Sequence, residues 1–146
     1  MTIGITNDHR GVKMKEILTN YLEHMEYNVI DYGTKTEESV DFPDYAYKLG
    51  KAILNKEVDL GIAICGTGIG MSIALNKMKN IYCAKVSTPA EASLAKAHNN
   101  ANVIAISEET SEELAKEIIK RFLETPFSNI NKYIRRNEKI KEIENE

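Results

Sequence analysis

The chain has 146 residues, about the size of one domain, so residues 1–146 are expected to form a single domain. Basic residues are interspersed with acidic ones and the formal net charge is −3, which makes nucleic acid an unexpected partner. No apolar run approaches the roughly 20 residues of a membrane span, and the polar residues that soon follow Ile5 leave no apolar core for a secretion signal.

Short runs rich in β-branched residues alternate with segments of helical period along the chain. Strands are predicted over residues 2–6, 28–32, 60–64, 82–86 and 103–106. Residues 12–26 place apolar side chains at i, i+3 and i+4, and the segments around 45–53 and 114–122 repeat this helical pattern. Alternating strands and helices imply right-handed crossovers, which predict a three-layer α/β/α sandwich with a five-stranded parallel Rossmann-like sheet.

Residues 129–146 differ from the rest because they are highly charged and have only a few apolar members. A lone helix of this polarity is marginal in water. The segment is therefore either a frayed tail or a helical arm that reaches a second subunit, and we favour the arm. The main apolar residues of the segment are Ile130, Ile134, Ile140 and Ile143.

Two cysteines without CxxC spacing indicate neither a disulfide framework nor a metal site, and they favour a reducing cytoplasm. Cys83 lies within an apolar strand and is interpreted as a core residue. Cys65 instead ends the third predicted strand and opens a glycine-rich loop, residues 65–72, which leads into a helix.

The glycine loop is the sharpest feature of the sequence. Gly66, Gly68 and Gly70 allow a tight turn that aims backbone N–H groups at one point, and with Ser72 they are expected to contact an anionic substrate. A thiol beside such donors is stabilised as a thiolate, so Cys65 and the loop offer a base and an oxyanion hole together. The alternative is a generic phosphate loop behind a buried cysteine, although neither the P-loop nor the GxGxxG signature is complete.

Two further loops carry polar side chains. Ligands of parallel α/β sheets bind beyond the carboxyl ends of the strands, where we expect the loops to gather. Asp8, His9 and Arg10 follow the first strand, while His98 and Asn99 precede the fifth. His98 could act as an acid or base near neutral pH or could simply cap its helix, and Asn99 could position a hydroxyl.

Together these loops resemble those of the ribose-5-phosphate isomerase B family, which also contains the galactose-6-phosphate isomerase subunits. The similarity runs in family order through most of the chain, and the cysteine-glycine loop combined with His98-Asn99 is its most specific part. The matching stretches are residues 7–11, 31–34, 38–46, 65–74, 76–77, 98–103 and 135–136.

The resemblance implies an aldose–ketose isomerase that requires no metal or other cofactor. Cys65 is similar to the base that moves a proton between C1 and C2, and the glycine loop with Thr67 resembles the anion hole for the enediolate. His98 matches the residue that opens the furanose ring, assisted by Thr67 or Asp8, and Asn99 matches a ligand of a substrate hydroxyl. The family also implies a homodimer, possibly paired into a tetramer, with an active site shared between subunits.

The phosphate-binding positions depart from the family pattern. His9 and Arg136 match phosphate-side residues, but Glu109 stands where the family usually has an arginine. We expect Arg10 and Lys132 to replace that cation.

Three functions stay open at this point. The first is interconversion of ribose 5-phosphate and ribulose 5-phosphate. The changed phosphate positions allow a six-carbon phosphosugar, such as allose or galactose 6-phosphate, as the substrate instead. A non-catalytic module that binds a sugar phosphate or nucleotide through the glycine loop is the third reading.

Overall fold

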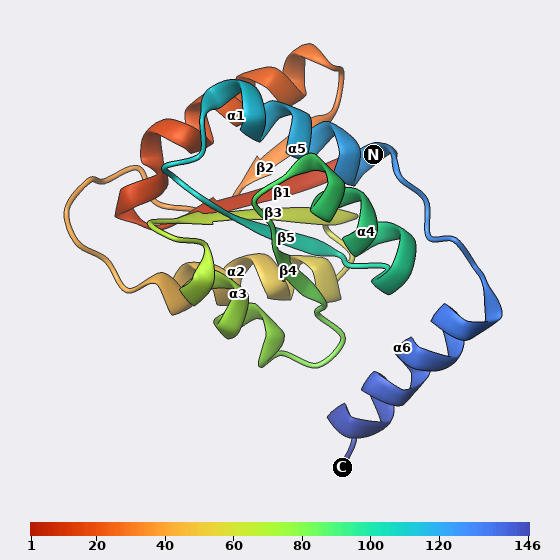
Figure 1. The fold of residues 1–146 in the computed structure, drawn as a ribbon. Coiled ribbons are helices and arrows are strands. Elements are labelled where there is room, and N and C mark those ends of the chain that lie inside the picture. The colour runs from red at the N-terminus through yellow and green to blue at the C-terminus, as the bar shows by residue number, and fades with distance from the viewer.

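The computed structural model describes residues 1–146 and forms three layers, with helices on both faces of a central sheet (Figure 1). The strands are β1 (Thr2–Asn7), β2 (Asn28–Asp31), β3 (Leu60–Cys65), β4 (Cys83–Lys85) and β5 (Val103–Ser107). The helices are α1 (Val12–His24), α2 (Phe42–Leu54), α3 (Ile69–Asn76), α4 (Pro89–Asn99), α5 (Glu112–Glu124) and α6 (Asn131–Glu144), and a short 3-10 helix spans His9–Gly11.

The sheet has the order β2-β1-β3-β5-β4, and all of its neighbouring strands run parallel. The predicted three-layer sandwich with a five-stranded parallel sheet is confirmed. All five strand predictions agree with the structure to within one residue at each end. The fourth strand is shorter than predicted, because Tyr82 and Val86 lie outside β4. The backbone N–H of Tyr82 donates to the Asn102 side chain at 2.8 Å instead.

Alternation along the strands divides the core between the two faces of the sheet. Ile62 and Ile64 of β3 point toward α1, α4 and α5, where the larger apolar cluster contains Phe122. Ala63 and Cys65 point to the other face, toward α2 and α3. Small side chains on this face let the two helices approach the sheet closely. The register therefore places the Cys65 thiol on the side of the sheet from which α3 begins.

Helix α6 lies apart from the core (Figure 1). None of its residues is buried, and it meets the body of the molecule mainly at α4. The helix predicted within residues 129–146 is confirmed, and the frayed tail is not what the structure shows. Its contact with a second subunit stays a prediction. None of the six helices combines the length and apolar character that a membrane crossing requires.

Candidate active site

Cys65 ends β3 at the carboxyl edge of the sheet, and its thiol is nearly buried, at 5% exposure. The backbone N–H of Gly68 donates to the Cys65 sulfur at 3.2 Å. Gly68 has a φ of 81°, in the left-handed region that glycine adopts without penalty, and this turn aims its N–H back at the sulfur. The loop therefore places a hydrogen-bond donor against the proposed base, as the sequence predicted.

Two hydroxyl groups fix the shape of this loop. Thr67 Oγ1 accepts from the backbone N–H of Ile69 at 3.1 Å, at the start of α3. The Ser107 hydroxyl donates to the Gly66 carbonyl at 2.7 Å, so it leaves the loop N–H groups free to face a ligand. The sequence reasoning missed Ser107. Its signal was a small polar residue at the carboxyl end of β5, opposite Cys65 in the sheet register.

The sequence predicted that Ser72 contacts the anionic substrate together with the loop, but its side chain is directed elsewhere. One turn into α3, its side chain lies close enough to the Cys83 thiol of β4 to influence the pKa of that thiol. Burial raises the pKa of the Cys83 thiol to about 12, and the Ser72 side chain opposes this only weakly. Cys83 is therefore protonated at neutral pH; it is partly buried and packs against the apolar cluster on this face of the sheet, so the prediction of a core residue is met only in part.

Asp8, His9 and Arg10 lie beside the glycine loop at the same edge of the sheet. The buried carboxylate of Asp8 accepts from the backbone N–H of Arg10 at 2.9 Å and caps the short 3-10 helix. His9 Nδ1 accepts from the backbone N–H of Val40 at 3.1 Å, which fixes the ring and leaves Nε2 available to a ligand. These three residues are brought together with Cys65 and Thr67 as the sequence predicted.

Arg10 lies over the glycine loop, since its guanidinium would be 3.3 Å from a Cβ atom placed on Gly66. It pairs with Glu108 at 2.7 Å. The hydrogen bond and the charge of Glu108 raise the pKa of Arg10, with a smaller contribution from Glu109. The carboxylate that would compete with a phosphate for Arg10 is thus chiefly Glu108, one residue before the position inferred from the sequence.

His98 and Asn99 lie at the opposite edge of the sheet, contrary to the expectation that all three loops meet. Helix α4 runs back from β4 and ends at Asn99, just before β5 begins. Residue 103, where β5 begins, is paired with Gly61, whereas Cys65 is paired with the last residue of β5. Four residues of strand separate the two ends by roughly 13 Å. One chain therefore cannot bring His98 to Cys65.

The cations of α6 accompany His98 at this amino edge. The His98 and Tyr133 rings stack with centroids 4.2 Å apart and an angle of 15° between the planes. Lys132 Nζ lies 5.0 Å and Arg136 Cζ 5.9 Å from the centre of the Tyr133 ring. Lys132 and Arg136 are thus remote from Arg10 in the same chain, and they could act with it only across a subunit boundary.

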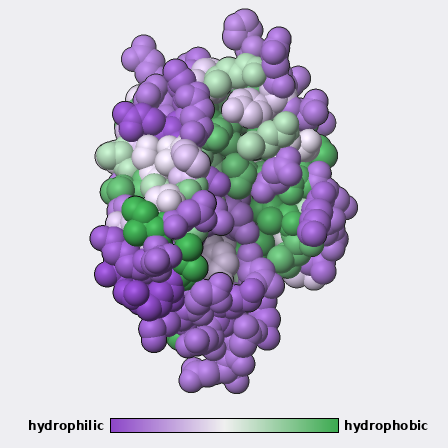
Figure 2. Space-filling view, turned by 90° about the vertical axis from the view of Figure 1, so that its right-hand side faces the viewer, coloured by the Kyte–Doolittle hydropathy of each residue, from purple (hydrophilic) through white to green (hydrophobic).

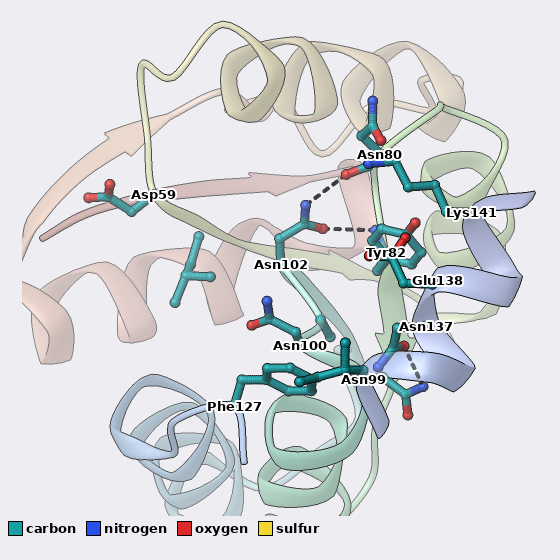
Figure 3. A pocket seen from close by; sticks show the side chains of 13 residues that line it. Asp59, Asn80, Tyr82, Asn99, Asn100, Asn102, Phe127, Asn137, Glu138 and Lys141 are labelled. Atoms are coloured by element: carbon teal, nitrogen blue, oxygen red, sulfur yellow. Dashed lines mark hydrogen bonds between the residues drawn. The ribbon is translucent and has the colours of Figure 1, made fainter. Parts of the chain in front are cut away.

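Beside this stack, the amino edge contains a pocket of about 470 Å³ between the body of the molecule and α6. Figure 2 views this side of the molecule and shows a hollow bordered by apolar and hydrophilic side chains. Five asparagines are among its 13 lining residues, and Asn99 hydrogen-bonds Asn137 of α6 there (Figure 3). The amino edge offers the His98 imidazole, amides and the cations of α6, and the carboxyl edge offers the Cys65 thiol, N–H donors, His9 and Arg10.

Comparisons with known proteins identify relatives of this chain. The model of the Ribose/Galactose Isomerase family matches residues 3–143. Ribose-5-phosphate isomerase B of Escherichia coli is 42% identical over 117 residues, which cover 80% of this chain and 78% of that protein.

Solved structures match over nearly the whole chain. Ribose-5-phosphate isomerase B of Clostridium thermocellum superposes with a TM-score of 0.96 at 40% identity, covering 99% of this chain and 98% of the other. The Mycoplasma genitalium enzyme with bound ribulose-5-phosphate gives 0.92 at 36% identity, covering 99% and 97%. The chain belongs to the Ribose/Galactose Isomerase family.

Proposed function

We propose that this protein interconverts ribose 5-phosphate and ribulose 5-phosphate through an enediolate, with Cys65 as the base. The observation that carries the proposal is the donation of the Gly68 N–H to the Cys65 sulfur at 3.2 Å, beside the start of α3. A thiolate there gains a charge-assisted hydrogen bond and the favourable end of the helix dipole. The relatives named ribose-5-phosphate isomerase B favour the five-carbon substrate over a hexose phosphate and over a binding module.

In the aldose-to-ketose direction, Cys65 removes the proton from C2 while the carbonyl oxygen at C1 becomes negatively charged. The N–H groups of the loop from Gly66 to Gly70, with Thr67, stabilise this oxygen. The proton then returns from the Cys65 thiol to C1, and the hydroxyl proton at O2 moves to O1, so no proton is gained or lost overall. These steps require no metal or other cofactor. A reducing cytoplasm would keep the Cys65 thiol from being oxidised.

We further propose that the active site is shared between two subunits. The separation of Cys65 from His98 within one chain supports this arrangement. His98 and Asn99 of one subunit would face the glycine loop of the other, and α6 would be the arm that holds them there. The phosphate would then meet His9 and Arg10 from one chain and Lys132 and Arg136 from its partner.

The first experiment measures conversion of ribose 5-phosphate by the wild type and by Cys65→Ala, without added metal and with allose 6-phosphate as a competitor. We expect turnover by the wild type, none by Cys65→Ala, and a higher specificity constant for the five-carbon sugar. Wild-type turnover of the hexose phosphate alone would refute the substrate assignment.

Mixing two inactive variants tests the shared site. Cys65→Ala and His98→Ala chains refolded together should form mixed dimers in which one site has both defects and the other has none. Random pairing then restores about a quarter of the wild-type activity. If each active site were instead contained within one chain, the mixture would stay inactive.

A further inference from the structure

Helix α6 is held against the body of the protein at the two residues that the proposed mechanism needs from the amino edge. Tyr133 stacks on the His98 imidazole, with ring centroids 4.2 Å apart. Rings this close and nearly parallel restrict rotation of the imidazole about its side-chain bonds. Two cations, Lys132 and Arg136, lie within 6 Å of the Tyr133 ring and add cation–π attraction that holds it in place. The stack thus fixes the plane of the imidazole from outside the core.

Asn137, one turn further along α6, joins the same two residues by hydrogen bonds. Its side-chain NH₂ group donates to the backbone carbonyls of His98 and Tyr133, both at 2.8 Å. Because carbonyl oxygens only accept, the orientation of the Asn137 amide follows from these partners. Its Oδ1 must then face Asn99, whose NH₂ group donates to it at 3.2 Å (Figure 3). Asn137 thereby sets the orientation of the Asn99 amide.

This orientation determines what Asn99 can offer a sugar. One of its N–H bonds is used on Asn137, while its Oδ1 has no hydrogen-bond partner within the chain. A free carbonyl oxygen accepts a hydrogen bond from a hydroxyl group. Without Asn137, the Asn99 amide could turn over and present N–H groups in place of this oxygen.

We propose that Tyr133 and Asn137 are positioning residues, which act through His98 and Asn99 respectively. This inference rests on the proposed function of the protein. Tyr133 holds the imidazole in the orientation that ring opening requires. In that step the C1–O4 bond of the furanose breaks, His98 delivers a proton to O4, and the anomeric hydroxyl loses a proton to water. Asn137 holds the Asn99 amide so that its oxygen receives a sugar hydroxyl. Tyr133 therefore acts on ring opening, and Asn137 on substrate affinity.

Ring opening can be measured apart from isomerisation with 2-deoxyribose 5-phosphate. This sugar lacks the 2-hydroxyl and cannot become a ketose, so the enzyme can only interconvert its anomers through the open chain. NMR exchange spectroscopy reports that rate. The wild type and Cys65→Ala should both accelerate anomer exchange. Tyr133→Leu should slow the enzyme-dependent exchange by about 2- to 10-fold, whereas Tyr133→Phe, which keeps the stack, should restore it.

Asn137→Ala should instead raise KM for ribose 5-phosphate with a smaller effect on kcat. The matched control is Asn145→Ala, because the Asn145 amide also donates to a carbonyl four residues earlier on α6, at 3.0 Å, but touches neither His98 nor Asn99. For Tyr133 the control is Tyr21→Leu, since Tyr21 lies under the Lys116 ammonium, 5.6 Å from its ring, on α1. Both controls should leave anomer exchange and KM unchanged.

The proposal is overturned if Tyr133→Leu exchanges anomers as fast as the wild type, or if Tyr133→Phe is as slow as Tyr133→Leu. An unchanged KM in Asn137→Ala overturns the second half. Sedimentation at the assay concentration selects variants that keep the assembly state of the wild type, so loss of assembly is not mistaken for loss of positioning. Retention of isomerase activity by Cys65→Ala would refute the proposed role of Cys65 instead. The anomer-exchange result could still be interpreted, because that reaction does not require Cys65.

Discussion

Replacing Gly68 by alanine tests both the structure of the glycine loop and its role in catalysis. The left-handed φ of 81° costs a residue with a Cβ atom about 1–2 kcal/mol. The added Cβ would also lie 3.0 Å from the backbone carbonyl carbon of Ile106, in a central strand that cannot move aside cheaply. We expect the free energy of unfolding to fall by about 2 kcal/mol. The N–H of residue 68 would move away from the Cys65 sulfur, and loss of such a donor lowers kcat by about 100-fold.

Urea denaturation at one fixed protein concentration measures the first effect, and initial rates on ribose 5-phosphate measure the second. Gly66→Ala is the stability control, because a Cβ at that position meets only the flexible end of Arg10, at 3.3 Å. It should unfold at nearly the wild-type urea concentration. A Gly68→Ala protein with wild-type stability and kcat would refute the reasoning about this turn.

Three further predictions concern charge and burial. Because burial raises the pKa of the Cys83 thiol to about 12, that thiol is protonated at pH 8, and peptide mass spectrometry should find it unmodified by iodoacetamide in the folded protein. Asp31→Asn removes the 3.0 Å ion pair of Lys15, whose side chain is only 7% exposed, and should lower the free energy of unfolding in urea by about 1–2 kcal/mol. Glu108→Gln frees Arg10 for the phosphate and should lower KM for ribose 5-phosphate, whereas Arg10→Ala should raise it about tenfold in steady-state assays.

Each of these has a result that contradicts it. Alkylation of Cys83 in the native protein at the rate seen in urea would mean that the thiol is exposed. Glu112→Gln breaks a solvent-exposed ion pair of α5 and should lower the free energy of unfolding by less than about 0.5 kcal/mol. An equally small loss for Asp31→Asn would mean that the burial of Lys15 does not strengthen its ion pair. Unchanged KM in both the Glu108 and Arg10 variants would remove Arg10 from the phosphate site.

The central sheet could be predicted from the sequence because its strands are short apolar runs that the turns delimit clearly. β3 and β5 differ from their predicted bounds only by the final Cys65 and Ser107. The fourth strand was overestimated because Tyr82 and Val86 have strand-like side chains, and only the partners of β4 in the sheet decide how far its pairing extends. Local patterns determine element type, and tertiary pairing determines element ends.

The site was predictable where its residues follow one another in the chain. The Cys65 loop and the Asp8-His9-Arg10 turn are continuous segments, so their chemistry is visible in the sequence. His98 was assigned to the wrong edge of the sheet. It lies near the end of α4, and this helix returns the chain from the carboxyl edge to the amino edge before β5 begins. The direction of the Ser72 side chain depends on Cys83, a neighbour that only the fold supplies.

The separation of Cys65 from His98 has a consequence for how activity depends on the amount of protein. On the shared-site proposal, an isolated chain has two halves of a site that it cannot bring together, so only associated chains turn over. At concentrations well below the dimer dissociation constant, the number of complete sites grows as the square of the chain concentration. A cell that halved expression in that range would retain about a quarter of the flux. By mass action, the reaction rate would then depend more steeply on gene dosage than it does for a monomeric enzyme.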